Sequence, residues 1–187
     1  MAEARTGTGA DAGGDGDEAV LRRVAAGDRA AFDLFHARFH GPVRGFAERI
    51  TGAGDRADEV ASDTMLAVWN GAAGFEGRSR VSTWVFGIAY RIALKSRHRD
   101  RRERSHVAID EAAALPDPAA VPAEVALDRG KVAAALRALP LELRAVMELT
   151  YFYGHTVADV AAVIGCPPGT VKSRMHAARR TLREALE

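Results

Sequence analysis

Apolar side chains recur at the spacing of an α-helix along most of this 187-residue chain. Val43, Phe46, Ala47 and Ile50 stand at positions i, i+3, i+4 and i+7, which lie on one face of a helix. Similar stripes follow at 57–68, 85–92, 132–139, 143–150, 157–164 and 171–182. No stretch shows the sustained apolar–polar alternation between turn residues that is typical of paired strands. The sequence therefore predicts an all-α fold.

Glycine, proline and capping residues predict where the first helices begin and end. Asp28 is a candidate N-cap, and Gly41-Pro42 is expected to break the helix that follows it. Residues 52–54 predict a turn, and Asn70-Gly71 predicts the end of the next helix. Ser82 is expected to cap a long, strongly basic helix.

Two polar stretches divide the chain. Residues 1–17 are mostly Gly, Ala and acidic residues, which bury too little apolar surface to offset chain entropy, so we expect a disordered acidic tail. Residues 105–126 contain acidic residues and three prolines, which predict a flexible acidic linker. Two small helical domains remain, at 18–104 and 127–187.

The end of the chain has the dimensions of a helix-turn-helix. Thr156 and Asp159 have the spacing of a capping box at the start of a short helix. Residues 165–168 then form a tight Gly- and Pro-containing break before a longer helix. A short helix, a brief turn and a longer helix match the DNA-binding motif.

The longer helix has a polar outer face. Its start offers short hydrogen-bonding groups suited to base edges in a major groove. Arginines farther along suit phosphates. The alternative is a basic helix that is merely solvated. The candidate DNA-binding residues here are Thr170, Lys172, Ser173, Arg174, His176, Arg179 and Arg180.

A second basic region lies at 78–104, where nine Arg or Lys residues oppose two acidic residues. Arg91, Lys95 and His98 lie one to two helical turns apart, opposite the apolar stripe, with Trp84 and Tyr90 nearby. Cations interleaved with aromatic rings suit single-stranded nucleic acid, whose bases stack and whose phosphates need neutralising. The alternative is a core tryptophan on a solvated basic helix.

Three segments carry a family resemblance: DEVASDTMLAVW at 58–69, FEGRSRVSTWVFGIAYRIA at 75–93, and 138–186, which contains GTVKSR. They resemble extracytoplasmic-function (ECF) sigma factors. The first two segments are similar to conserved region 2 of that family and the last to region 4. No region 3 lies between them, which is typical of this class.

The resemblance implies how promoter DNA is held. Lys172, Ser173 and His176 match positions that read the −35 element. The loop at 77–82 and the helix after it match the part that captures and melts the −10 element. Residues implied there are Arg78, Arg80, Ser82, Thr83, Trp84, Tyr90, Arg91, Lys95, Arg97 and His98. The family usually carries Asn and Asp where this chain has Arg91 and Lys95, so its usual base specificity is not expected to carry over unchanged.

The resemblance also implies protein partners. The helix at 58–69 matches the surface that docks on the clamp helices of the largest subunit of core RNA polymerase. The implied contacts are Asp58, Glu59, Asp63, Thr64, Leu66 and Trp69. An anti-sigma protein is expected to hold the chain inactive. No cofactor, metal or catalytic residue is implied.

Two other functions are compatible with parts of the sequence. An autonomous helix-turn-helix regulator would share the C-terminal half but has no need of the basic region at 78–104. An all-α hydrolase would use His36 and His40, an i, i+4 pair without an HExxH glutamate or an evident third ligand.

Cys166 is the single cysteine, so an internal disulfide is excluded. We expect Cys166 to be a packing thiol rather than a redox sensor. With no long apolar run and an N-terminus unlike a signal peptide, the chain is expected to be cytoplasmic and not inserted in a membrane.

Overall fold

The computed structural model describes residues 14–52, 54–104 and 123–187, and these residues fold entirely into helices and short connections. The helices are α1 (Gly14–Ala25), α2 (Arg29–Thr51), α3 (Gly54–Gly71), the 3₁₀ turn η1 (Ala72–Gly74), α4 (Val81–Arg104), α5 (Ala123–Ala138), α6 (Leu141–Tyr151), α7 (Val157–Ile164) and α8 (Pro168–Leu186). The described part of the chain contains no strand, so the predicted all-α fold is confirmed.

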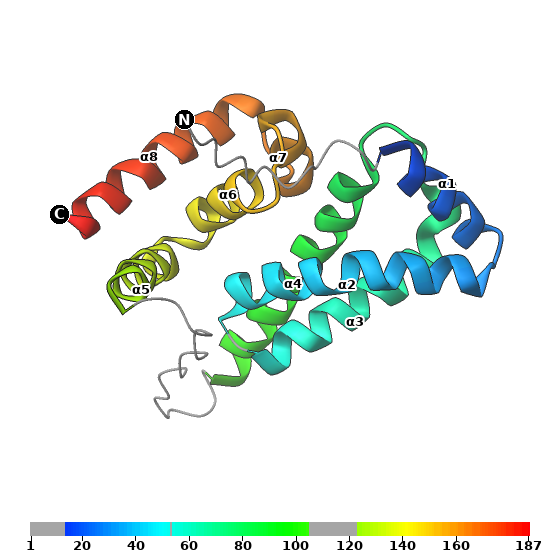
Figure 1. Cartoon of the computed structure of the whole chain (residues 1–187), viewed down its shortest axis with the longest axis horizontal. Helices are drawn as coiled ribbons and strands as arrows, with labels where there is room; N and C mark the ends of the chain where they lie inside the picture. The colour runs from blue at the N-terminus through cyan, green and yellow to red at the C-terminus, as the bar shows by residue number, and fades with distance from the viewer. Residues whose placement is uncertain (1–13, 53, 105–122) are drawn as a thin grey trace.

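Helices α1–α4 form the N-terminal unit (Figure 1). The core lies between α2, α3 and α4, where Phe35, Phe46 and Val85 are almost completely buried. Val60 and Val68 of α3 are buried in the same cluster. Helix α1 packs across one end through Leu21 and Val24. The unit therefore depends on the apolar stripes from which its helices were predicted.

Helix α2 does not break at Pro42, contrary to the sequence prediction. A proline inside a helix removes one N–H donor and crowds the carbonyl four residues earlier, at a cost of about 3 kcal/mol. The helix nevertheless runs from Arg29 to Thr51 with Pro42 inside it. Phe39, Val43 and Phe46, on both sides of the proline, belong to one buried stripe, and their packing outweighs that cost.

Other predicted boundaries also shift. Helix α1 begins at Gly14, and Asp17 is buried and paired with Arg38 at 3.0 Å, so the predicted disordered tail is wrong at 14–17. Residues 1–13 of that tail and 105–122 of the predicted linker lie outside the described residues. Residues 123–126 of the linker belong to α5. Helix α4 begins at Val81, so Ser82 lies in its first turn instead of capping it.

Helices α5–α8 form the C-terminal unit, with the predicted helix-turn-helix at α7 and α8. Thr156 and Asp159 form the predicted capping box, which satisfies N–H groups at the start of α7. Gly165 ends α7 in the left-handed conformation, with φ 74°. Leu136 of α5 and Leu139, which directly follows α5, pack on the end of α8, whereas Val132, expected on the same face, is 42% exposed.

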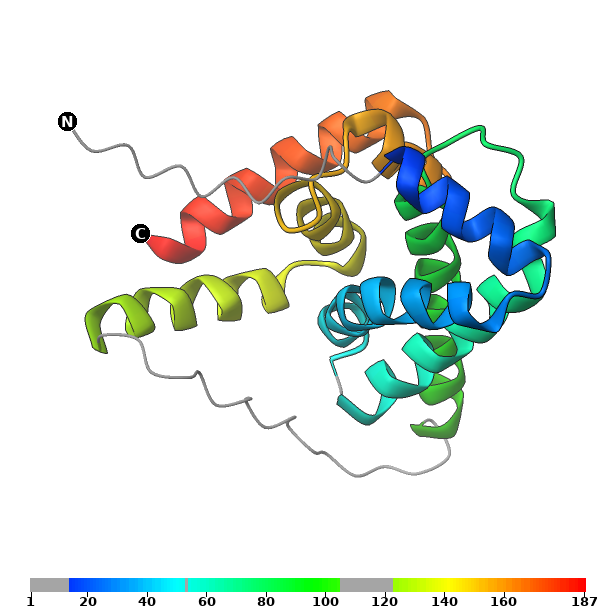
Figure 2. The same cartoon turned by 45° about the vertical axis from the view of Figure 1, so that its right-hand side comes forward.

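The two units are packed against each other. In Figures 1 and 2, α7 lies beside the first half of α4, and the end of α6 lies beside α2. Phe86 of α4 contacts the rings of Tyr153 and His155, which follow α6, with centroid separations of 4.5 and 5.1 Å. Buried residues of α6, α7 and α8 join the same apolar cluster as those of α1–α4.

Candidate nucleic-acid and partner surfaces

The outer face of α8 is exposed as the sequence predicts. Val171, Met175 and Ala178 are buried against α6 and α7, which fixes how the helix is rotated. Lys172, Ser173, His176 and Arg180 consequently face away from the protein and are exposed. A helix of 19 residues carrying cations on its free side has the shape and charge to enter a major groove.

Arg174 and Arg179 of α8 are engaged within the protein. The guanidinium of Arg174 donates to Glu142 of α6 at 2.6 Å and approaches the Cys166 sulfur at 3.8 Å. Arg179 donates to the Tyr151 hydroxyl at 2.6 Å and lies over its ring. These two arginines therefore hold α8 on α6, while Lys172 and Arg180 remain the more available cations of the face, with the exposed His176 beside them.

The basic helix α4 has two distinct faces. Arg91, Lys95 and His98 are exposed on one of them. On the other, Thr83 and Tyr90 are only 2% and 4% exposed because α7 and its neighbours cover them. The sequence placed all five side chains on one nucleic-acid surface, and the structure divides them.

The aromatic residues of α4 are more buried than expected. Trp84 is half-buried and meets Phe75 edge-on, with ring centroids 5.4 Å apart. Tyr90 is buried, and desolvation raises the pKa of its hydroxyl. The predicted exposed aromatic surface therefore contains part of Trp84 but not Tyr90.

The remaining basic residues of this region differ in how freely they can reach a ligand. Arg78 is exposed beside Glu76, with which it forms an ion pair. Arg97 is half-buried and donates to the Ile50 carbonyl at the end of α2 at 3.1 Å. Cations near the C-terminal carbonyls of a helix are stabilising, so Arg97 also has a structural role.

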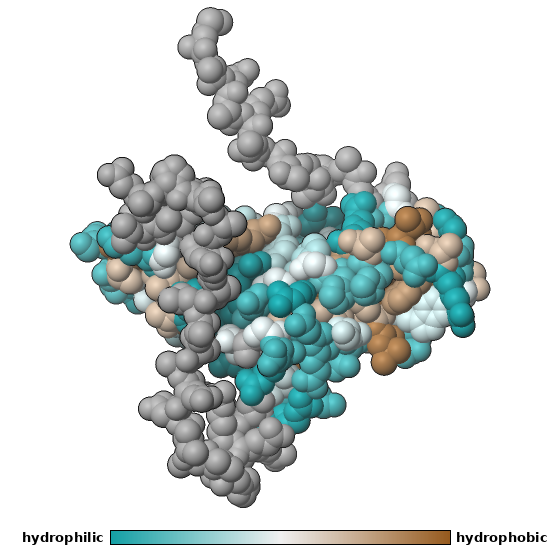
Figure 3. All heavy atoms as spheres, turned by 60° about the horizontal axis from the view of Figure 1, so that its bottom comes forward, coloured by the Kyte–Doolittle hydropathy of each residue, from teal (hydrophilic) through white to brown (hydrophobic). Residues whose placement is uncertain are grey.

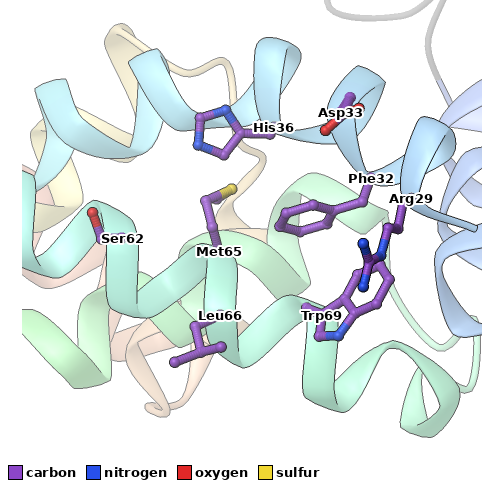
Figure 4. Close-up of a pocket in the computed structure, with 8 residues that line it drawn as sticks. All are labelled: Arg29, Phe32, Asp33, His36, Ser62, Met65, Leu66 and Trp69. Atoms are coloured by element: carbon purple, nitrogen blue, oxygen red, sulfur yellow. The ribbon is translucent and has the colours of Figure 1, made fainter. Parts of the chain in front are cut away.

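A groove with a volume of 560 Å³ lies between α2 and α3 (Figure 4). Phe32 and Trp69 meet edge-on inside it, with ring centroids 5.1 Å apart. Met65 lies beneath the groove, and Leu66 points outward and is 58% exposed. The lining residues are Arg29, Phe32, Asp33, His36, Ser62, Met65, Leu66 and Trp69.

Acidic side chains lie in this groove and elsewhere on α3, and Asp33 of α2 is the acidic residue among those that line it. Asp58, Glu59 and Asp63 project from α3, and all are exposed. Asp58 accepts a hydrogen bond from Arg44 at 2.5 Å, and Glu59 accepts one from Arg99 at 2.8 Å. A largely apolar groove that contains Asp33, on a surface where Asp63 is also exposed, suits an amphipathic, basic partner helix.

Thr64 does not belong to that surface. Its side chain is fully buried, and its hydroxyl donates to the Val60 carbonyl at 2.6 Å. The sequence also missed the α2 side of the groove, including Phe32 and His36, because Phe32 matched the core stripe. Figure 3 shows apolar side chains gathered toward the end of the molecule formed by α1–α3, where Leu34 is also 59% exposed.

Charged residues at the contact between the two units were not predicted as important. The carboxylate of Glu148 on α6 is almost completely buried and lies 2.5 Å from the guanidinium of Arg49 on α2. Burial raises the pKa of Glu148, which Arg49 opposes. Arg49 also donates to the hydroxyl of Tyr153, which donates in turn to the Pro42 carbonyl at 3.0 Å. Burial raises the pKa of Tyr153 to about 12.

His36 and His40 stack on each other with ring centroids 4.5 Å apart. Burial lowers the pKa of His40, and the neighbouring His36 adds to that effect. Among the described residues, no group of three or more His, Cys, Asp or Glu side chains is placed to hold a metal ion.

Both units match models of known protein families. Residues 35–103 match the model of sigma-70 region 2, and residues 129–182 match that of sigma-70 region 4. The RNA polymerase sigma-H factor of Pseudomonas aeruginosa is 30% identical over 182 residues, spanning 91% of this chain and 94% of that protein. The ECF RNA polymerase sigma factor SigM of Mycobacterium tuberculosis is 32% identical over 173 residues, spanning 91% of this chain and 84% of its own length.

The chain belongs to the ECF sigma factor family. Region 2 therefore extends from within α2 to α4, and region 4 from within α5 to α8. The resemblance stated from the sequence is confirmed, with both regions in the expected order. In the part of the chain that the structure describes, no helix is both long and apolar enough to cross a membrane.

Solved structures of similar proteins agree with this assignment. The structure of CnrH in complex with the cytosolic domain of CnrY has a TM-score of 0.65 and 25% identity, covering 91% of this chain and 96% of that one. The sigma factor RpoE in complex with the anti-sigma factor NepR from Bartonella quintana also has a TM-score of 0.65, with 26% identity over 83% of this chain and 96% of that one.

Proposed function

We propose that this ECF sigma factor directs core RNA polymerase to its promoters through three surfaces: the outer face of α8, the exposed face of α4 and the groove between α2 and α3. The observation that carries this proposal is the pairing of region 2 and region 4 in one chain, with a basic recognition helix exposed on region 4. An autonomous helix-turn-helix regulator has no use for region 2.

Region 4 reads the −35 element with α8. Lys172, Ser173 and His176 project from the first turns of the helix, where side chains reach base edges in a major groove. Arg180 lies two turns farther along and is placed for a phosphate. Thr170 is half-buried, and its carbonyl accepts a hydrogen bond from Ser173 at 2.9 Å, so Thr170 helps to position the reading side chains.

Region 2 binds the −10 element with the exposed face of α4. Arg91 and Lys95 present positive charge to the separated strand, His98 adds an exposed imidazole, and the half-buried Trp84 offers a ring for base stacking. Arg78 in the preceding loop adds a further cation. Because phosphate contacts are insensitive to sequence, the charges of Arg91 and Lys95 contribute affinity more than base selection.

The groove between α2 and α3 binds the clamp helices of the polymerase. Leu66 and Trp69 supply apolar contact, and Asp63, exposed on the same helix, pairs with basic side chains of the partner. The Phe32 ring, packed on Trp69, extends this contact to α2. The protein acts as an initiation factor in the cytoplasm and catalyses no reaction itself. An anti-sigma protein is proposed as a further partner, as in the complex of RpoE with the anti-sigma factor NepR.

Three single variants test these assignments on a promoter that responds to the protein. Lys172→Ala is expected to weaken binding to the −35 element by about 1–3 kcal/mol if Lys172 contacts a base edge.

Arg91→Ala is expected to slow strand opening more than it weakens closed-complex formation. Strand opening is measured by the fluorescence of 2-aminopurine in the −10 element. Leu66→Glu is expected to abolish binding to core polymerase by placing a charge in the apolar groove.

A matched control is Arg183→Ala, which removes an exposed cation near the end of α8, away from the proposed reading positions. It is expected to lower affinity equally for matched and mismatched −35 sequences. The surface assignments are wrong if Lys172→Ala behaves like this control and the other two variants transcribe like the wild type.

A further inference from the structure

Asp159 connects the two units at the start of α4. One carboxylate oxygen accepts hydrogen bonds from Arg80 at 2.5 Å and from the Thr156 backbone N–H and hydroxyl at 2.9 and 2.6 Å. The other oxygen accepts a hydrogen bond from the Thr83 hydroxyl at 2.8 Å. Asp159 belongs to the helix-turn-helix of region 4, and it thus accepts hydrogen bonds from two side chains of region 2.

These donors form a site for an anion. A guanidinium and a hydroxyl converge beside the first turn of α4, where the helix dipole also favours negative charge. Burial alone raises the pKa of Asp159, but hydrogen bonds from Thr156, Thr83 and Arg80 outweigh it and hold the pKa well below its ordinary value. The surroundings of this carboxylate therefore strongly favour its charged form.

The same contact covers one face of α4. A Cβ built on Gly87 would lie 3.9 Å from the Val163 Cα, so the backbones of α4 and α7 approach closely there. Thr83 and Tyr90, on the same side of α4, are buried. In Figure 2, α7 lies beside the first half of α4, the half to which Thr83 belongs.

We propose that the Asp159 carboxylate takes the place of a nucleic-acid phosphate on Arg80 and Thr83, so that region 4 masks part of the single-strand-binding surface of region 2. The proposal rests on the proposed function of α4 in binding the −10 strand. The ligand of the unmasked site is a phosphate of single-stranded DNA. Promoter melting then requires α7 to leave α4, and the exposed cations Arg91 and Lys95 remain available in both states.

An engineered disulfide tests whether the contact must open. Gly87→Cys and Val163→Cys are combined in a Cys166→Ser chain, because the close approach of residues 87 and 163 suits the Cα separation of about 4.4–6.8 Å that a disulfide needs. The probe is a fluorescein-labelled single strand carrying the non-template −10 sequence of a responsive promoter. The oxidised chain is expected to bind it at least tenfold more weakly than the reduced chain. Equal binding by the two forms overturns the proposal.

Two further variants separate charge competition from loosening of α7. Asp159→Asn removes the charge and keeps one acceptor for the cap, and it is expected to bind the single strand several-fold more tightly than the wild type. Thr156→Ala weakens the cap of α7 and leaves the carboxylate on Arg80 and Thr83, so it is expected to bind like the wild type. The proposal fails if Asp159→Asn gains nothing, or if Thr156→Ala gains as much.

Promoter-dependent transcription distinguishes this failure from failure of the proposed function. The wild-type and reduced chains are both expected to support specific transcription with core polymerase, and the oxidised chain is expected to lose it. If the wild-type chain supports none, the proposed function is wrong. If all three chains support it equally, only the masking proposal is wrong.

Discussion

Glu148 shows at the residue scale how the two units depend on each other. Its carboxylate is 1% exposed, whereas its partner Arg49 keeps 37% of its side chain exposed. A buried carboxylate needs a close cation because desolvation in the interior costs several kcal/mol. The Arg49 partner comes from the other unit, so packing α6 against α2 is a condition for burying Glu148 without leaving it unpaired.

Replacing Glu148 should therefore destabilise the protein, because the positive charge of Arg49 is left without its partner. Glu148→Ala is expected to lower the free energy of unfolding by about 2 kcal/mol, toward the low side for a broken buried pair because water can reach Arg49. Urea unfolding followed by circular dichroism measures it. The double variant Arg49→Leu/Glu148→Leu should recover much of the loss, and a loss equal to the sum of both single variants would contradict this explanation.

His155 predicts a dependence of stability on pH. It is 3% exposed, and burial lowers its pKa below the ordinary 6.5, against the pull of Asp159. The unfolded chain therefore takes up this proton at higher pH than the folded chain does, and stability falls as the pH drops below about 6.5. The expected loss attributable to His155 is about 1 kcal/mol between pH 7.5 and 5.5.

The His155→Phe variant isolates this effect, since it keeps a ring against Phe86 and removes the titrating group. Urea unfolding at pH 7.5, 6.5 and 5.5 should show a smaller decrease for the variant than for the wild type. The raised pKa of Glu148 has the opposite effect on stability at lower pH, but it is present in both chains and cancels in the comparison. Parallel pH profiles for the two chains would show that His155 is not responsible.

At the scale of single helices, packing decides where local signals conflict. The sequence predicted the helical stripes, the capping box at Thr156 and the exposed face of α8 because each depends on residues within a few turns. It failed at Pro42, where a local breaking signal opposed a stripe that runs in phase from Phe35 to Ile50. Following the phase of the stripe across the proline would have indicated a continuous helix.

Pro42 should consequently be a weak point of α2. Pro42→Ala restores a backbone N–H and relieves crowding, although it also frees the unfolded chain, so the net gain in unfolding free energy is expected to be about 1–2 kcal/mol. The exposed position of Pro42 leaves room for the change. Chemical denaturation of the two chains measures the difference, and a less stable alanine variant would show that the proline ring makes a favourable contact.

At the scale of the whole molecule, the packing of region 4 on region 2 could not be predicted from the sequence. The partners that define it, such as Arg80 with Asp159 and Arg49 with Glu148, are 79 and 99 residues apart and carry no mutual spacing signal. The sequence therefore placed Thr83 and Tyr90 on an open nucleic-acid face, when α7 and its neighbours cover both. The groove between α2 and α3 was half-predicted for the same reason, because only α3 carried the family pattern.

The most direct test of the central claim uses genomic DNA of the host organism as template. Core RNA polymerase transcribes it in vitro with and without the purified chain, and the 5′ ends of the transcripts are sequenced. New start sites are expected that appear only with the chain and share two upstream sequence elements at a fixed separation. Start sites that are unchanged by the chain, or that share no such elements, would contradict its assignment as a promoter-specific sigma factor.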